Sequence, residues 1–276
     1  MTILRAACIQ MTSGIDVAGN IAVSTDLVRR AHAAGAQIVG LPEVANLCDR
    51  NRSRILENAR SEQDDPALAA WRKLAAELGV WLLAGSLVVR VGPGKLANRG
   101  FLIAPDGSIS AKYDKLHRFD VDLANGESYR ESALFDAGDR AVLAATPWGG
   151  LGMTICYDMR FPQLYRSLAK AGAAMIWVPA AFTRTTGRAH WHVLLRARAI
   201  ETGAFVLAPA QCGDHPDGRS TYGHALIVSP WGEVLADAGE EPGFIVADLD
   251  LDRVAEARAM IPALRHDRDF APPNPG

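Results

Sequence analysis

The chain has 276 residues, of which 49% are apolar and 22% charged, an ordinary composition for a globular protein. Its 29 basic and 31 acidic residues give a net charge of −2, which favours neither nucleic acid nor an anionic membrane as a partner. The longest apolar stretches, such as AGAAMIWVPAAF, are shorter than the ~20 residues that span a bilayer, and the N-terminal segment lacks an apolar signal region. We therefore expect a cytoplasmic protein that does not enter the membrane.

The first half of the chain alternates predicted strands and helices. Asp16 is a candidate N-cap, and Asp65 followed by Pro66 is a cap with proline at the first helical position. Gly79 follows the last apolar position of the second helix, as expected of a C-terminal glycine. The predicted elements are strand 3–9, helix 17–34, strand 37–41, helix 66–78 and strands 80–90, 99–104 and 108–113.

The second half begins with a long irregular, charged segment over residues 114–140, and long loops in compact domains are often functional. After it we predict strands 141–146 and 151–155, a helix after Pro162, strand 174–179, helix 188–202 and strands 204–209, 224–229, 233–236 and 244–248. Trp191, Leu194, Leu195 and Ile200 give the second helix a face that we assign to the core. The alternation predicts a single α/β domain over 1–276 with mixed sheets and a loose tail, 271–276.

Cys156 stands where an apolar strand, LGMTI, runs into YDMRFP. A strand that enters a sharp turn before a helix is where hydrolases expose a nucleophile, because the following backbone N–H groups point at the same place. The alternative is a buried structural cysteine, since free cysteine is among the most buried residues. We take the other three cysteines, Cys8, Cys48 and Cys212, as reduced structural thiols, because no pair has CxxC spacing.

Two charged residues are candidates to act with Cys156. Glu43 follows an apolar strand, in GLPEV, where a carboxylate is costly unless it is paired or used; the alternative is an exposed loop acid. Lys115 lies in KYDKLHRFDVD, which is otherwise a solvated charge run. Amide hydrolysis through a thioester needs a thiolate, a base and an oxyanion donor. Glu43 suits the base, and Lys115 with the backbone N–H of Tyr157 suits the oxyanion donor.

The motifs GLPEV, KYDKLHRFDVD and GMTICYDMRFPQLYR, in this order, resemble the nitrilase superfamily of carbon–nitrogen hydrolases from Ile3 to about Leu264. The resemblance implies a four-layer α-β-β-α sandwich, usually a homodimer with the helix after Pro162 and the C-terminal tail near the interface. It also implies catalytic roles for Glu43, Lys115 and Cys156. The second family glutamate falls at Glu131 rather than the nearby Glu127, because Glu131 is followed by a small residue and a short run to a Gly-Asp pair.

The segment from AAFTRTTGRAHWH to STYGHALIVSPWGEVLAD is similar to one branch of that superfamily, which contains deaminated glutathione amidases and ω-amidases. The resemblance implies hydrolysis of deaminated glutathione to 2-oxoglutarate and cysteinylglycine. Alternatives are ω-amidase action on 2-oxoglutaramate, or action on an N-carbamoyl amino acid or a nitrile. The substrate-binding residues that we expect are Arg160 as a carboxylate clamp, with Tyr157, Phe182 and Thr183. Weaker candidates, equally suited to salt bridges, are Arg184, Arg188, His215, Arg219 and Tyr222.

Two rival interpretations belong to other classes. A Cys–His dyad could use one of four histidines, whose spacing favours none of them: His117, His190, His192 and His224. The other rival is a catalytically inactive binding scaffold, which would have no reason to keep Glu43, Lys115 and Cys156 together. In such a scaffold no cysteine should react faster than the others with an alkylating agent, whereas in the enzyme Cys156 should react first. No cluster has metal-ligand spacing and no glycine pattern matches a nucleotide loop, so we predict neither metal nor other cofactor. The expected partner is a small-molecule amide.

Overall fold

The computed structural model describes residues 2–123 and 126–273. Residues 271–273 of the predicted tail are exposed and lie outside any helix or strand, and residues 274–276 lie outside the described residues. Within the described ranges, no helix combines the length and apolar character that crossing a membrane requires.

The larger sheet has ten described strands and mixed pairing, in the order β15-β14-β1-β2-β3-β5-β4, with β18 paired to β1, and β6 and β9 paired to β5. Strands β14, β1, β2 and β3 pair in parallel. The remaining pairs along that order, β15 with β14, β3 with β5 and β5 with β4, are antiparallel. Its strands are β1 (Ile3–Met11), β2 (Ile38–Gly40), β3 (Trp81–Leu83), β4 (Leu87–Gly92), β5 (Lys95–Ile103), β6 (Ile109–Asp114), β9 (Phe135–Asp136), β14 (Ala210–Asp214), β15 (Ser220–Tyr222) and β18 (Gly243–Asp250).

The smaller sheet has six described strands in the order β10-β11-β12-β13-β16-β17. They are β10 (Val142–Thr146), β11 (Gly149–Met153), β12 (Ala173–Trp177), β13 (Phe205–Ala208), β16 (Leu226–Val228) and β17 (Val234–Asp237). A separate hairpin pairs β7 (Asp120–Asp122) with β8 (Ser128–Arg130). The helices are α1 (Val17–Ala33), α2 (Arg52–Asn58), α3 (Pro66–Leu78), α4 (Pro162–Lys170), α5 (Arg184–Thr202) and α6 (Asp252–Met260), with 3-10 turns η1 (Glu131–Ala133) and η2 (Cys156–Arg160).

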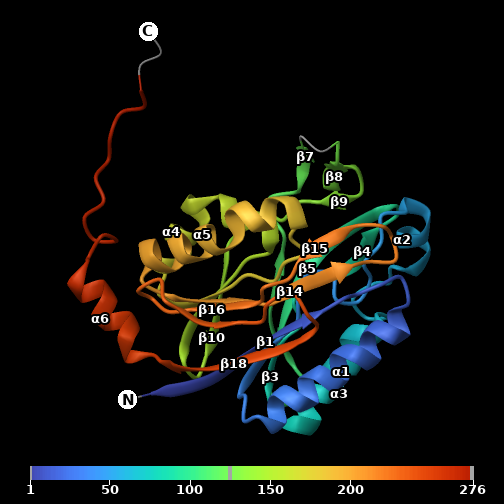
Figure 1. The fold of residues 1–276 in the computed structure, drawn as a ribbon, viewed down its shortest axis with the longest axis horizontal. Coiled ribbons are helices and arrows are strands. Elements are labelled where there is room, and N and C mark those ends of the chain that lie inside the picture. Colours follow the sequence, from blue (N-terminus) through green and yellow to red (C-terminus); the bar gives the residue numbers. More distant parts are fainter. Residues whose placement is uncertain (1, 124–125, 274–276) are drawn as a thin grey trace.

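The elements form four layers, with α1 and α3 on the outer face of the larger sheet and α4 and α5 on the outer face of the smaller one (Figure 1). Alternate residues of β1 show how the larger sheet separates two cores. Leu4 and Cys8 belong to the core between the sheets, whereas Ile9 and Met11 belong to the core under α1 and α3. A strand buried on both faces is rich in apolar residues, and Ala6 to Ile9 of this strand form such a run. The predicted α-β-β-α sandwich with mixed sheets is therefore confirmed.

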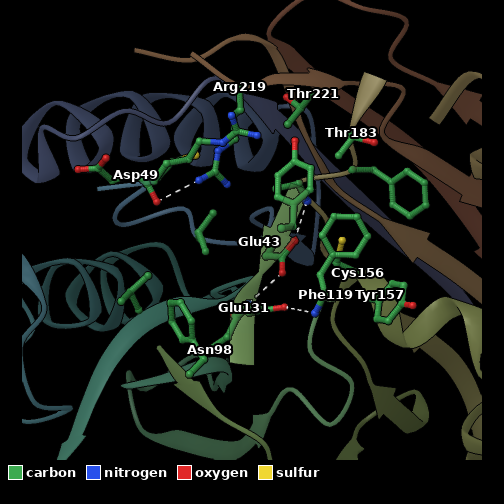
Figure 2. A pocket seen from close by; sticks show the side chains of 18 of the residues that line it. Glu43, Asp49, Asn98, Phe119, Glu131, Cys156, Tyr157, Thr183, Arg219 and Thr221 are labelled. Carbon is green, nitrogen blue, oxygen red and sulfur yellow. Dashed lines mark hydrogen bonds between the residues drawn. The ribbon is translucent and has the colours of Figure 1, made fainter. Parts of the chain in front are cut away.

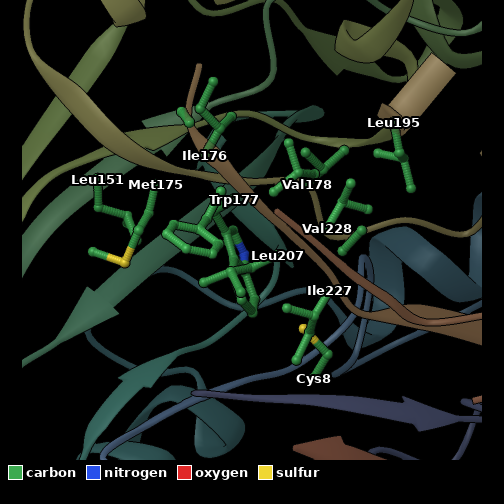
Figure 3. Packing of buried hydrophobic residues seen from close by; sticks show 14 of the residues in the cluster. Cys8, Leu151, Met175, Ile176, Trp177, Val178, Leu195, Leu207, Ile227 and Val228 are labelled. Atoms are coloured by element: carbon green, nitrogen blue, oxygen red, sulfur yellow. The ribbon is translucent and has the colours of Figure 1, made fainter. Parts of the chain in front are cut away.

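The two sheets are in close contact at Gly40, the last residue of β2. A Cβ atom there would lie 1.3 Å from the ring of Trp177, which ends β12, so only glycine fits. Figure 3 shows Trp177 packed among Met175, Leu207 and other residues of the core between the sheets. Because protein cores are close-packed, this contact fixes the spacing of the strand ends that continue into Glu43 and Ala181.

Capping residues predicted helix boundaries well. The side chain of Asp16 accepts a hydrogen bond from the N–H of Ala18, and Asp65 caps α3, whose C-cap Gly79 is left-handed at φ 65°. The second-half helix begins at Arg184 instead of residue 188, because Thr183 is its N-cap. Ile200 was wrongly assigned to the core, since it is 55% exposed. The helices and strands that the sequence did not predict are α2, β7, β8, β9, β14, β15 and α6, of which β7, β8 and β9 lie in the segment 114–140 that was expected to be irregular.

Candidate active site

Cys156 lies 8% exposed at the start of η2, just beyond β11. Its backbone is left-handed at φ 47°, and its N–H donates to the carbonyl of Pro179 at 2.9 Å. Val44, next to Glu43, is also left-handed at φ 50°. Such conformations are unfavourable for residues other than glycine and gather at functional sites, where the surroundings hold them.

Cys156 opens into a cavity of about 340 Å³ whose wall includes all four predicted catalytic residues. The cavity lies between the two sheets' loop ends, and Figure 2 shows Glu43, Glu131 and Cys156 gathered at one place in it. The other lining residues are Val44, Leu47, Cys48, Asp49, Arg50, Ile55, Val88, Asn98, Lys115, Phe119, Ser128, Tyr129, Arg130, Leu134, Phe135, Tyr157, Ala181, Phe182, Thr183, Thr186, Arg219, Ser220 and Thr221.

Lys115 lies between two carboxylates. Its ammonium donates to Glu43 Oε1 at 2.8 Å and to both oxygens of Glu131, at 3.1 and 2.9 Å. Glu43 Oε2 accepts from the N–H of Ala181 at 2.8 Å, and Glu131 Oε2 accepts from the N–H of Phe119 at 2.6 Å. Each carboxylate is therefore held by N–H donors from more than one segment.

These contacts set the protonation states of the buried groups. Burial raises the pKa of Glu43, but the charge and hydrogen bond of Lys115 outweigh it and hold that pKa below its ordinary value. Burial lowers the pKa of Lys115, but the carboxylates of Glu131 and Glu43 outweigh it and raise that pKa well above its ordinary value. Burial and then the charge of Glu43 raise the pKa of Cys156, whose thiol is within hydrogen-bonding reach of that carboxylate. The resting site thus holds a neutral thiol beside an ionised Glu43.

Asn98, on β5, joins the site although the sequence analysis did not select it. Its amide nitrogen donates to Glu43 Oε1 at 2.9 Å and to Glu131 Oε1 at 3.1 Å. Asn98 thus donates one further N–H to each carboxylate, and a hydrogen bond donated to a carboxylate favours its charged form. The available signal was a polar side chain inside the apolar strand KLANRGFLI, where burial without a partner would be costly.

Asp158 fastens the turn that carries Cys156 to the segment that carries Lys115. Its Oδ2 accepts from the hydroxyl of Tyr113 at 2.7 Å and from the N–H of Ile155 at 2.9 Å. Its Oδ1 accepts from the N–H of His117 at 3.1 Å and lies 2.7 Å from Nδ1 of the same ring. Two sequence motifs that lie about forty residues apart are therefore one physical unit, with a fully buried carboxylate between them.

The predicted substrate-binding residues fall into two groups. Tyr157, Phe182 and Thr183 line the cavity. Arg160 does not; its guanidinium lies 5.9 Å from the ring centroid of Tyr157 and 5.2 Å from that of Phe182, on two side chains that form the wall. The role of Arg160 as a carboxylate clamp stays a prediction.

Histidine and the other cysteines contribute little to this cavity. Among the described lining residues there is no histidine, and His117 is bonded to Asp158, which disfavours a Cys–His dyad. Cys48 does line the cavity, but burial raises the pKa of its thiol to about 12. Cys8 and Cys212 are buried elsewhere, and all four thiols are free.

One group of described side chains has the geometry of metal ligands, outside the cavity lining. His192, His224 and Asp237 each place a ligand atom within 4.8 Å of the others. Hydrogen bonds join Asp237 to both imidazoles, at 3.0 Å for His192 and 2.9 Å for His224. The sequence analysis missed this group because its members are far apart in the chain, and the expected independence from metal stays a prediction.

A sandwich of this topology, with a buried thiol beside a carboxylate–ammonium–carboxylate array, has the chemical groups of an amide-cleaving enzyme. The family model described as carbon-nitrogen hydrolase matches residues 5–259. The chain therefore belongs to the carbon–nitrogen hydrolase family, within the nitrilase superfamily, and is an enzyme that hydrolyses carbon–nitrogen bonds.

Curated relatives are similar over nearly the whole chain. A protein of Synechocystis sp. named deaminated glutathione amidase is 43% identical over 269 residues, covering 95% of this chain and 97% of the relative. Proteins with the same name from Yersinia enterocolitica and Homo sapiens are each 37% identical, and each match covers 96% of this chain, with 93% and 82% of the relatives covered.

Solved structures share the fold. The NitFhit protein of C. elegans superposes with a TM-score of 0.90 at 36% identity; the match covers 96% of this chain but 65% of that one. Nit3 of Saccharomyces cerevisiae, described as a member of branch 10 of the nitrilase superfamily, gives a TM-score of 0.85 at 27% identity, with 94% of each chain covered. A glutamine mutant of a Nesterenkonia amidase, 29% identical with a TM-score of 0.79, is described as carrying acrylamide on its active-site cysteine; that match covers 94% of this chain and 98% of that one.

Proposed function

We propose that the enzyme hydrolyses an amide through a thioester on Cys156, with Glu43 as the general base. The observation that carries this proposal is the position of Glu43, whose carboxylate contacts the ammonium of Lys115 and is within hydrogen-bonding reach of the Cys156 thiol. A base must reach the proton that it removes, and its pKa must leave it ionised beforehand. The Nesterenkonia amidase supports the choice of nucleophile, since its active-site cysteine takes acrylamide.

In the first half of the reaction, the proton of the Cys156 thiol moves to Glu43 as sulfur attacks the carbonyl carbon. The carbonyl oxygen gains negative charge, which the ammonium of Lys115 and the backbone N–H of Tyr157 stabilise. When the carbon–nitrogen bond breaks, Glu43 returns its proton to the leaving nitrogen, which departs as a neutral amine or ammonia. The acyl group remains on sulfur as a thioester.

In the second half, water replaces the amine. Glu43 takes a proton from the water as its oxygen attacks the thioester carbon, and the same oxyanion donors act again. The carbon–sulfur bond breaks, the proton goes back to sulfur, and the carboxylic acid leaves. Glu131 acts through Lys115: its two oxygens hold the ammonium in place, so it is a positioning residue.

We propose deaminated glutathione as the substrate, cleaved to 2-oxoglutarate and cysteinylglycine. The support is the shared name of the relatives at 37–43% identity over nearly the full chain. Tyr157, Phe182 and Thr183 would contact the acyl part, and Arg160 beside them would bind its carboxylate. The second candidate is 2-oxoglutaramate, which has the same acyl group and ammonia as its leaving group.

The test is kcat/KM for a panel of amides, followed by release of amine or ammonia. Deaminated glutathione should be the best substrate, 2-oxoglutaramate should follow, and an N-carbamoyl amino acid and a nitrile should react at background rates. A clear preference for 2-oxoglutaramate would assign the enzyme to the ω-amidases. A preference for the nitrile or the N-carbamoyl compound would refute the proposed substrate class.

We also propose that the enzyme is a cytoplasmic homodimer. The predicted interface is α4 and the C-terminal tail. Large apolar side chains are exposed on α5, which packs against α4, and from the end of α6 onward: Val193, Ile200, Met260, Ile261 and Phe270. Surface of this kind, when contiguous, marks interaction sites. Sedimentation should give twice the 29.6 kDa of one chain, and a particle of one chain's mass would refute the dimer.

A further inference from the structure

Three arginines line the cavity apart from the catalytic array, and one of them, Arg130, is paired with Asp122. Arg50 and Arg219 both line it, together with Tyr129. In Figure 2, Arg219 and Asp49 lie on one side of Cys156 and Tyr157 lies on the other. The proposed acyl contact of Tyr157 is therefore on the opposite side of the nucleophile from Arg219, so the part of the substrate that faces Arg219 is the leaving group.

Arg219 is rigidly placed. Its side chain is 18% exposed, its Nε donates to the buried carboxylate of Asp217 at 2.8 Å, and its Nη2 donates to the carbonyl of Asp49 at 3.0 Å. Within the described chain, no hydrogen bond engages its Nη1. A guanidinium held on one edge keeps its remaining donors oriented for a ligand, which reduces the entropy lost on binding.

Arg50 carries a charge that no described carboxylate neutralises through an ion pair. Its guanidinium lies 4.8 Å from the ring centroid of Tyr129. The adjacent carboxylate of Asp49 is occupied, because Arg54 donates to both of its oxygens, at 2.7 and 2.8 Å. The Tyr129 hydroxyl donates to Glu127 at 2.9 Å, which leaves the ring face to Arg50.

A hydrogen bond from Arg219 to the carbonyl of Asp49, the residue before Arg50, places the two arginines close together at the cavity wall. Burial raises the pKa of the Tyr129 phenol, and both Arg50 and Arg219 act to lower it. Cys48, whose pKa is raised first by burial, is influenced by the charges of both Arg219 and Glu43. Tyr129 thus lies within range of both arginines, and one side chain, Cys48, lies within range of both Arg219 and Glu43.

We propose that Arg50 and Arg219 form a subsite for a carboxylate on the leaving-group side of the scissile amide. The inference rests on the proposed amidase function and specifies which amides the site prefers: those whose amine is a short peptide or amino acid with a free C-terminal carboxylate. Two residues beyond the scissile nitrogen reach roughly 7 Å. A primary amide, which releases ammonia, has no group for this subsite and gains nothing from it.

The experiment compares deaminated glutathione with its C-terminal carboxamide, which differs only in the charge at the far end of the leaving group. The unmodified enzyme should favour the acid by about 10- to 100-fold in kcat/KM, the range expected for hydrogen bonds to a charged group. Arg50→Gln should reduce that preference about tenfold through KM, with the carboxamide unaffected. The exposed position of Arg50 makes this variant compatible with folding.

Arg219→Lys keeps a charge opposite Asp217 and removes the guanidinium, so it should lower the preference without loss of the fold. Arg52→Gln is the matched control, because Arg52 is also exposed, lies two residues from Arg50 and is absent from the lining; it should behave as the unmodified enzyme. Equal kcat/KM for the acid and the carboxamide in the unmodified enzyme would refute the subsite but not the amidase function. An equal fall in kcat/KM for both compounds in Arg50→Gln would do the same. Inactivity of the unmodified enzyme on both would overturn the proposed function and the subsite with it.

Discussion

The two sheets contribute different kinds of group to the cavity. The larger sheet and its loops supply the charges: Glu43 follows β2, Lys115 follows β6, and Asn98 lies on β5. The smaller sheet supplies the thiol of Cys156 after β11 and the N–H of Ala181 after β12. The charges are held by several direct hydrogen bonds, whereas the nucleophile is placed by a strained turn.

This difference teaches that the chemistry depends on how the sheets are joined. Neither sheet holds both the nucleophile and its base. Besides the core between them, the sheets are joined near the cavity by the Ala181 N–H bond to Glu43, the bonds of Asp158 to Tyr113 and His117, and the packing of Trp177 against Gly40. Substitutions of catalytic residues on one sheet should therefore lower the rate of hydrolysis. Substitutions at the contacts between the sheets should lower both the rate and the free energy of unfolding.

The largest effect is expected from Cys156→Ala. Hydrolysis should fall to background, because no thioester forms, while the unfolding midpoint changes little, since one sulfur at a strand end is lost. Amine release and denaturant unfolding are the measurements, and Cys212→Ala is the control that should stay active. More than trace hydrolysis by the Cys156 variant would refute the thioester route.

Lys115→Gln removes the charge between the two carboxylates. We expect kcat to fall by about 10²- to 10³-fold, as for loss of one oxyanion donor in other hydrolases. Steady-state kinetics measure it. Lys112→Gln, an exposed lysine on the same strand that pairs with Glu62, should leave kcat unchanged. Equal kinetics for the two variants would show that Lys115 has no role in the transition state.

Asp158→Asn tests a joint between the sheets. Asparagine keeps one acceptor oxygen where the carboxylate serves the Tyr113 hydroxyl, the Ile155 N–H and His117. A buried donor left without an acceptor costs about 1–3 kcal/mol, so both stability and kcat should drop. Urea unfolding and kinetics measure the two effects, with Tyr113→Phe as a milder control. Loss of activity without loss of stability would argue for a direct chemical role of Asp158.

The smallest effect is expected from pH. Lys115 lowers the pKa of Glu43 despite its burial, and burial raises the pKa of Cys156, so the reactive pair of carboxylate and thiol persists across neutral pH. Acid removes activity only where Glu43 gains a proton, below the ordinary glutamate value of about 4.3. The profile of kcat/KM should be flat from about pH 6 to 8. An acid limb centred near the histidine value of about 6.5 would favour a Cys–His dyad instead.

The sequence predicted helix starts and strand ends well because their signals are local. Asp65 with Pro66 marks a helix start, and an apolar strand before Cys156 marks an exposed strand end, whatever the rest of the chain does. The resemblance then supplied the four-layer arrangement and brought Glu131 into the set. The structure places Glu43, Lys115, Glu131 and Cys156 on one cavity.

The parts that the sequence missed depend on distant contacts. Asn98 is an ordinary strand residue until two glutamates from other segments lie against its amide. Arg160 looked like a cavity residue from its distance to Cys156 in the chain, but the 3-10 turn directs it over the rings of Tyr157 and Phe182. The short strands β14 and β15 carry little periodicity, and they form because β1 offers an edge to β14.

The array of Glu43, Lys115 and Glu131 has a consequence for the whole catalytic cycle. Two carboxylates and one ammonium leave the compartment with one net negative charge at rest, and the only mobile proton is on sulfur. In the proposed reaction that proton moves from sulfur to Glu43 and on to the leaving amine, and a proton from water later returns to sulfur. The net charge of these side chains is therefore the same before attack and after product release. A site that keeps the same net charge needs no counterion to enter or leave. At saturating substrate, kcat should therefore be almost insensitive to ionic strength.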